Sequence, residues 1–188
     1  MAGLSLSKGQ SLSLTKSDGS ALKNIIVGLG WDPAFGGREI DLDASIILFD
    51  AAGKNVDTVW YGSTKSKDRA VLHSGDNLTG AGDGDDEQIR VDLDSIDSRI
   101  TAGVVVITSY TKQKFAQVKN VYARVVDASA GGDNELVRYN LAGDNGDYTA
   151  SVIAKFERDG AGWKFTAVGN PANGHKASKV VADAQRVL

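Results

Sequence analysis

The sequence predicts an all-β protein, a β-sandwich of two mainly antiparallel sheets with a short C-terminal helix. Most of the chain is divided into short segments that alternate apolar and polar residues or are apolar throughout, and turn residues separate them. The period changes to helical spacing in the tail, after residue 176. Two packed sheets are the architecture that buries the apolar faces of about ten such strands.

The N-terminal quarter is expected to hold two edge strands, a buried strand and the strongest strand of the chain. Residues 4–6 and 11–15 alternate apolar and polar residues, which is typical of a hairpin or of two edge strands. Residues 25–31 form a short apolar run with two glycines, a length that favours a buried strand over a helix. Residues 40–49 place alternate apolar side chains on one face and begin the other face with two aspartates.

Further strands are predicted along the rest of the chain. They cover residues 56–61, 70–73, 87–93, 104–108, 121–126, 136–141, 148–156 and 164–168. Residues 104–108 are apolar on both faces and are therefore expected at the centre of a sheet. Residues 94–99 are predicted to form one helical turn, residues 112–118 a loop or short helix, and residues 177–188 an amphipathic helix packed on a sheet.

The composition limits the classes of function. At 188 residues and 41% hydrophobic content, the chain is expected to form one domain, residues 1–188. It has no cysteine, which excludes disulfides, thiol catalysis and thiolate metal sites, and its two histidines exclude a three-histidine zinc site. A pI near 5.4 argues against a nucleic-acid binder. No apolar run is long enough for membrane insertion and no signal peptide is recognised, so a cytoplasmic location is expected.

Residues 73–87 are the stretch that points most directly to chemistry, because five carboxylates alternate there with four glycines. Between His73 and Asp94 the net charge is −6, whereas the whole chain carries −3. Such a density of like charge is unfavourable unless water screens it, as in a solvated acidic loop, or a cation neutralises it. The glycines, which let carbonyls turn inward, and the acidic pair Asp41 and Asp43 favour a Ca²⁺ or Mg²⁺ site.

Every kind of oxygen ligand that calcium uses is present in these segments. The candidate ligands are Asp32, Asp41, Asp43, Asp76, Asn77, Asp85, Asp86 and Glu87, with Gly80 and Gly84 as carbonyl donors. If residues 85–87 are extended, Asp85 and Glu87 point one way and Asp86 the other, which suggests two ions. The spacing of an EF-hand and the lysine of a phosphate-binding loop are both missing.

Three stretches of the chain resemble the TerD family of tellurium-resistance and stress-response proteins. They are Gly-Leu-Gly-Trp-Asp at 28–32, Asp-Leu-Asp-Ala-Ser at 41–45, and Gly-Asp-Asn-Leu-Thr-Gly-Ala-Gly-Asp-Gly-Asp-Asp-Glu-Gln-Ile at 75–89. The opening and several later segments, such as 115–118 and 162–169, resemble the family as well. The resemblance implies a calcium-binding β-sandwich with two ions, in the bacterial cytoplasm. It also implies other tellurium-resistance proteins as partners, including one in the membrane.

Two alternatives stand beside a non-enzymatic calcium-binding module. One is a Mg²⁺-dependent phosphoesterase-type enzyme, because clustered carboxylates can hold a catalytic metal, with His73 and Arg90 as the nearby groups for acid–base or charge chemistry. A single histidine beside a loop is more often structural. The other is a calcium-dependent ligand-binding module, in which Trp31, Trp60 or Tyr61 stacks on a ligand of the metal. Aromatic residues of β-proteins more often lie in the core.

Overall fold

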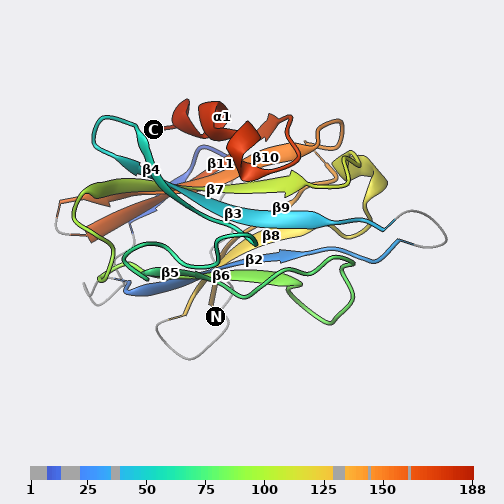
Figure 1. The fold of residues 1–188 in the computed structure, drawn as a ribbon, viewed down its shortest axis with the longest axis horizontal. Coiled ribbons are helices and arrows are strands. Elements are labelled where there is room, and N and C mark those ends of the chain that lie inside the picture. The colour runs from blue at the N-terminus through green and yellow to red at the C-terminus, as the bar shows by residue number, and fades with distance from the viewer. Residues whose placement is uncertain (1–7, 14–21, 35–38, 129–133, 144, 161) are drawn as a thin grey trace.

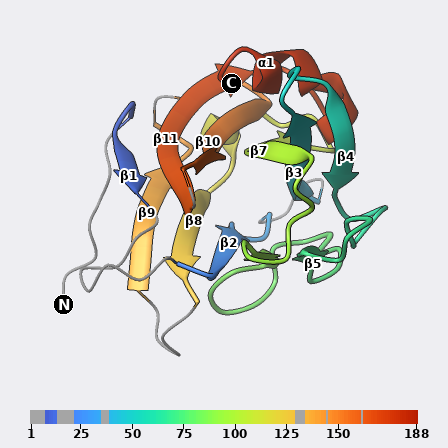
Figure 2. The same cartoon turned by 90° about the vertical axis from the view of Figure 1, so that its left-hand side faces the viewer.

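The computed structural model describes residues 8–13, 22–34, 39–128, 134–143, 145–160 and 162–188, and it folds into two packed antiparallel sheets (Figures 1 and 2). One sheet has the strand order β1-β11-β10-β7-β3-β4 and the other β5-β6-β2-β8-β9. The strands are β1 (Ser11–Ser13), β2 (Asn24–Gly30), β3 (Leu42–Asp50), β4 (Asn55–Val59), β5 (Val71–His73), β6 (Glu87–Asp92), β7 (Ile100–Ser109), β8 (Tyr122–Asp127), β9 (Asn134–Asn140), β10 (Ala150–Asp159) and β11 (Gly162–Ala172). The predicted β-sandwich is confirmed.

The main core lies between the sheets, and β3 shows how the sequence positions it. The alternate residues from Ile40 to Leu48 all face this core, as their spacing predicts. Ile47 and Phe49 face the opposite side of the sheet and are also buried. β7 lies between β3 and β10 and is buried on both faces along residues 104–107, which confirms its predicted central place.

The C-terminal segment covers the outer face of the six-stranded sheet (Figure 1). It consists of the 3₁₀ helix η2 (Ala177–Lys179) and the α-helix α1 (Val181–Gln185), which is shorter than the predicted helix over 177–188. Ala177, Val180 and Ala184 are buried in a cluster with outward residues of β3 and β7. The prediction of an apolar face packed on the sheet is therefore confirmed.

Two local predictions, for residues 94–99 and 56–61, change in the structure, whereas the short helix allowed within residues 112–118 is confirmed. Residues 94–99 form hydrogen-bonded turns instead of a helical turn, because the Asp92 carboxylate accepts hydrogen bonds from the backbone N–H groups of Asp94 and Ser95. Residues 112–118 contain the 3₁₀ helix η1 (Phe115–Gln117). The strand expected at 56–61 ends at Val59, where the chain turns. Of the predicted N-terminal hairpin, β1 is an edge strand and residues 4–6 lie outside the described residues.

One feature of the sheet topology positions the acidic segments. β4 pairs with β3 only from Ile46 onward, whereas β7 pairs with β3 along its whole length, starting at Leu42. The first four residues of β3 therefore have an open edge on the β4 side. The chain between β5 and β6, which contains the acidic loop, lies against this edge through the contacts described below. None of the described helices has the length and apolar character needed to cross a membrane.

Candidate metal centre

Three of the predicted ligands come together at the start of β3. Asp41 lies just before the strand, Asp43 lies within it, and Asp76 comes from the loop between β5 and β6. One carboxylate oxygen from each lies within 4.8 Å of the others. Asp41 and Asp43 are 8% and 2% exposed, while Asp76 is exposed to solvent. Two elements distant in sequence thus supply one acidic cluster.

The buried oxygens of this cluster have no hydrogen-bond partner among the described residues. This holds for Oδ1 of Asp41 and for both carboxylate oxygens of Asp43. The hydroxyl oxygen of Thr108, which is the cross-strand neighbour of Asp43 in β7, is likewise buried and unpartnered. Cross-strand neighbours place their Cβ atoms about 5 Å apart on the same face. Buried polar atoms in folded proteins are nearly always paired, so four such atoms at the start of β3 and its neighbour make this a candidate ligand site.

In the absence of a cation, the acidic groups of the cluster have raised pKa values. Burial, together with the charges of Glu87, Asp41 and Asp76, raises the pKa of Asp43 to about 8. Burial, with Asp76 and Glu87, raises the pKa of Asp41 to about 6. Burial raises the pKa of the adjacent Tyr61 to about 12, with the charge of Asp43 as the next contribution. The carboxylates repel one another and hold protons that a divalent cation would displace.

Glu87 and His73 have a different role, because they complete the open edge of β3. Glu87 Oε2 accepts a hydrogen bond of 2.8 Å from the backbone N–H of Ala44. His73 Nε2 lies 3.2 Å from the carbonyl oxygen of Ala44 and 3.3 Å from Glu87 Oε2. His73 Nδ1 accepts from the backbone N–H of Gly75, so Nε2 carries the proton of the neutral ring. These two fully buried side chains replace the partners that β4 does not supply.

Asn77 and Asp86 shape the loop. The Asn77 side-chain oxygen accepts hydrogen bonds from the backbone N–H groups of Thr79 and Gly80. Its side-chain nitrogen donates to Asp86 Oδ1 at 3.2 Å, and Asp86 Oδ2 accepts from the backbone N–H of Trp31 at 2.9 Å. Both residues are therefore held by contacts within the loop and with Trp31, and each of the oxygens named here already accepts a hydrogen bond.

Asp85 holds the loop to the outer face of the five-stranded sheet. Its carboxylate accepts two hydrogen bonds from Arg124, at 2.8 and 2.9 Å, and one each from Tyr122 and Gln88. The carboxylate lies over Gly28, where an added Cβ would come within 2.2 Å of it. Its side chain is fully buried. Asp85 and Glu87 thus point to opposite faces, and the expected shared direction is wrong because β6 begins only at Glu87.

The remaining predicted ligands are Asp32, Gly80 and Gly84. Asp32 accepts a hydrogen bond of 2.8 Å from the side chain of Asn120. Gly80 and Gly84 have left-handed backbone conformations, with φ of +67° and +89°. An added Cβ on Gly80 would lie 2.4 Å from Nε1 of Trp31, so the position requires glycine.

Sequence reasoning missed two residues that contact or adjoin this region. Thr108 and Ser109 are the polar residues at the end of a strand that is apolar over residues 102–107, and this is the only sign of the role of Thr108. Arg124 is a charged residue in the middle of the mainly apolar strand β8, and a side chain only 15% exposed in such a place requires an acidic partner. Neither pattern identifies the partner, because Asp43 and Asp85 are distant in the chain.

Comparisons with known proteins agree with these observations. The model of the TerD domain matches residues 1–180. Tellurium resistance protein TerZ of Serratia marcescens is 40% identical over 190 residues, covering 96% of each chain. General stress protein 16U of Bacillus subtilis is 41% identical over 180 residues, covering 91% of this chain and 92% of that protein. A crystal structure of a homologue of telluride resistance protein TerD from Streptomyces coelicolor shares the fold, with a TM-score of 0.76 at 22% identity, covering 86% of this chain and 96% of that one.

Proposed function

Because this chain belongs to the TerD family, we propose that it is a non-enzymatic calcium-binding protein of a bacterial tellurite-resistance and stress-response system. The proposed calcium site is supported by one observation above all: the carboxylates of Asp41 and Asp43 have buried oxygens without hydrogen-bond partners, and they lie beside Asp76. The proposal also includes a cytoplasmic location. Its expected partners are other tellurium-resistance proteins, one of them in the membrane.

The donor set fits calcium. Calcium takes six to eight oxygen ligands from carboxylates, hydroxyls, carbonyls and water in an adaptable arrangement. Asp41, Asp43 and Asp76 supply carboxylate oxygens, and the Thr108 hydroxyl is a neutral donor on the same face as Asp43. When bound, the ion would neutralise the cluster and join the start of β3 to the loop between β5 and β6. These residues therefore hold the ion at a point where the fold otherwise concentrates negative charge.

A second ion is part of the proposal, and we expect it to bind more weakly than the first. The loop carboxylates left for it include Asp86, whose two oxygens already accept hydrogen bonds, and Asp32, which accepts one from Asn120. A second ion would have to displace these donors. Asp85 would have to give up its two hydrogen bonds from Arg124 to act as a ligand.

The arrangement around the cluster supports binding over catalysis. His73 is fully buried, and both of its ring nitrogens are engaged. Arg90 is exposed and alternates with the inward residues of β6, so it faces away from the sandwich interior. Trp31 is 4% exposed and donates its indole N–H to the carbonyl of Ile40, which leaves no face for stacking on a ligand. We therefore assign neither acid–base chemistry nor a stacking platform to these three residues.

The test is a calorimetric titration of chelator-treated protein with Ca²⁺ and then with Mg²⁺. The proposal predicts calcium-selective binding that Asp43→Asn weakens by about two orders of magnitude, because this substitution removes a buried ligand charge with little change in shape. Asp83→Asn is the matched control, since Asp83 is an exposed acid of the same loop. Equal weakening in both variants would mean that only the net charge matters. Absence of calcium binding would leave a solvated acidic loop, and a preference for Mg²⁺ would favour the enzyme alternative.

A further inference from the structure

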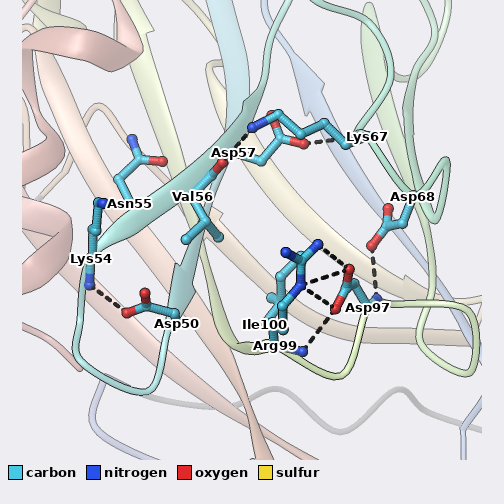
Figure 3. A pocket seen from close by; sticks show the side chains of 10 residues that line it. All are labelled: Asp50, Lys54, Asn55, Val56, Asp57, Lys67, Asp68, Asp97, Arg99 and Ile100. Atoms are coloured by element: carbon cyan, nitrogen blue, oxygen red, sulfur yellow. Dashed lines mark hydrogen bonds and ion pairs between the residues drawn. The ribbon is translucent and has the colours of Figure 1, made fainter.

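A cavity of about 530 Å³ lies at the end of β3 opposite the acidic cluster. Figure 3 shows the residues that line it. Its walls come from the end of β3, the start of β4, and the loops that precede β5 and β7. Asp43 and Asp50 lie near the two ends of β3, and seven residue steps along the strand separate them by roughly 23 Å. The cavity is therefore a second location, in the size range of small-molecule sites.

Two β-bulges open the sheet at this point. Leu48 pairs with Asp57 and Phe49 with Asn55, so Val56 is an extra residue in β4. On the other side of β3, Phe49 pairs with Ala102 and Asp50 with Ile100, so β7 also has an extra residue. Bulges bend a strand and increase its twist, and they occur frequently next to binding sites. Here one bulge lies in β4 and the other in β7, on the two sides of the same end of β3.

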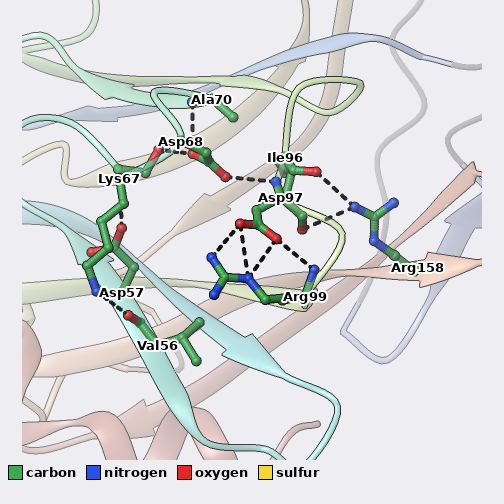
Figure 4. A network of polar contacts seen from close by, with 10 residues as sticks. Val56, Asp57, Lys67, Asp68, Ala70, Ile96, Asp97, Arg99 and Arg158 are labelled. Atoms are coloured by element: carbon green, nitrogen blue, oxygen red, sulfur yellow. Dashed lines mark hydrogen bonds and ion pairs between the residues drawn. The ribbon is translucent and has the colours of Figure 1, made fainter.

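The aspartates that line the cavity are occupied by hydrogen bonds from the protein itself. Asp57 accepts a backbone N–H group on each oxygen, at 2.9 and 2.8 Å. Asp68 accepts a backbone N–H group on each oxygen, at 3.0 and 2.8 Å. Asp97 accepts the side chain of Arg99 on both oxygens (Figure 4). These hydrogen bonds lower the pKa of Asp97 to about 2. Asp50 accepts two backbone N–H groups on Oδ1, at 3.0 and 2.9 Å. All four lining aspartates are thus engaged in holding the loops together.

The basic residues keep unused donors. Lys54 makes no side-chain hydrogen bond or ion pair within the part of the chain that is described. Lys67 donates one of its three N–H groups to the carbonyl oxygen of Val56, at 2.9 Å. Arg99 uses Nε and Nη2 on Asp97, which leaves Nη1. Figure 3 shows these three residues on different sides of the cavity, with Val56 between them. The free hydrogen-bonding capacity is therefore mainly that of donors with positive charge.

The wall that carries Arg99 is held in place by contacts from a neighbouring strand. Arg158 donates a hydrogen bond to the carbonyl oxygen of Ile96 at 3.0 Å (Figure 4). It also donates to the carbonyl oxygen of Ile100 at 2.9 Å. Its guanidinium also lies 4.5 Å from the centre of the Trp163 ring. A binding site whose walls are fixed in advance loses less entropy when it takes a ligand.

We propose that this cavity binds a small organic phosphate. Lysine ammonium and arginine guanidinium groups are the side chains that recognise phosphate oxygens. The volume exceeds what a bare ion needs, and Val56 with Ile100 provides apolar surface for an organic moiety. A phosphate ester supplies both the acceptor oxygens and that moiety. This site is separate from the calcium centre, and the inference does not rest on the proposed function.

The test uses isotopically labelled full-length protein in chelator, so that no metal bridges phosphate at Asp41 and Asp43. Adenosine monophosphate is titrated and amide shifts are followed by nuclear magnetic resonance. The expected result is saturable shifts confined to residues 54–57, 66–68 and 97–100, with no shift on titration of adenosine. The double variant Lys54→Gln, Lys67→Gln is expected to weaken binding at least about tenfold, equivalent to about 1.4 kcal/mol.

The control is Lys179→Gln, an exposed lysine of η2 that is not among the lining residues. It should leave the affinity unchanged. Shifts spread over surface lysines, or equal loss of affinity in the control, would overturn the proposal. Inorganic phosphate or tellurite binding as tightly as adenosine monophosphate would overturn the assignment to an organic ligand, since a bare oxyanion would then suffice.

Discussion

Raising the pH from about 5 to about 8 is expected to destabilise the calcium-free protein. The pKa of Asp43 is about 8 in the folded protein against 3.8 for an ordinary aspartate. Between these values the folded state binds a proton that the unfolded state has lost, so stability falls as pH rises. A group in this interval contributes about 1.4 kcal/mol per pH unit. Because this slope falls to half as the pH reaches the folded pKa of about 8, the total over the three units is about 3.5 kcal/mol. Asp41, with a pKa of about 6, adds to the same slope at its lower end.

Saturating calcium is expected to remove this slope. The cation favours the deprotonated carboxylates, so the folded state no longer holds the extra proton. The stabilisation by calcium should therefore grow from about pH 5 to about pH 8. Urea unfolding in chelator and in calcium, at several pH values, measures both curves. Asp43→Asn should flatten the chelator curve, because its side chain does not titrate.

A free energy of unfolding that stays constant or rises with pH in chelator over this interval would refute this prediction. It would also be refuted if Asp43→Asn left the slope unchanged, since the slope would then belong to other groups. Asp83→Asn is again the suitable control, because this exposed carboxylate lies outside the cluster.

Three further predictions concern single contacts. Thr108→Val should weaken calcium binding about tenfold in calorimetry without lowering the stability of the calcium-free protein, because it removes a buried hydroxyl that has no partner. Arg124→Gln should lower the free energy of unfolding by about 3 kcal/mol in urea titrations, because the fully buried carboxylate of Asp85 loses its charged partner. An unchanged stability would mean that Asp85 is solvated in solution. Gly80→Ala should cost about 2 kcal/mol by the same measurement, because a Cβ there collides with the Trp31 ring and the backbone is left-handed.

The sequence was sufficient for the features that depend on local pattern. Alternation along residues 40–49 placed Asp41 and Asp43 on the face away from the core, and apolar residues on both faces placed 104–108 at the centre of a sheet. Helical spacing located the C-terminal cover but overestimated its helix, because spacing does not distinguish a 3₁₀ turn from an α-helix over so few residues.

The sequence was not sufficient to sort the acids of the loop into those with and without partners. The role of Glu87 depends on the N–H of Ala44, which is free only because β4 stops short. The role of Asp85 depends on Arg124, which is 39 residues away. Both are long-range contacts that alternation cannot encode. Neighbouring acids of one loop therefore differ in role: some make structural hydrogen bonds, and others are candidate metal ligands.

The open edge of β3 connects the fold to the proposed choice of metal. The Glu87 and His73 side chains cover that edge, and this fixes where the acidic loop meets the strand. Asp41 and Asp43 are two residues apart on one face, roughly 7 Å between Cα atoms, and belong to a buried sheet with little freedom to move. Asp76, in contrast, comes from an exposed loop. Magnesium demands a compact octahedron and keeps most of its water, whereas calcium accepts more ligands at longer and more variable distances. A cluster that combines two fixed carboxylates with an adaptable third therefore suits calcium better than magnesium.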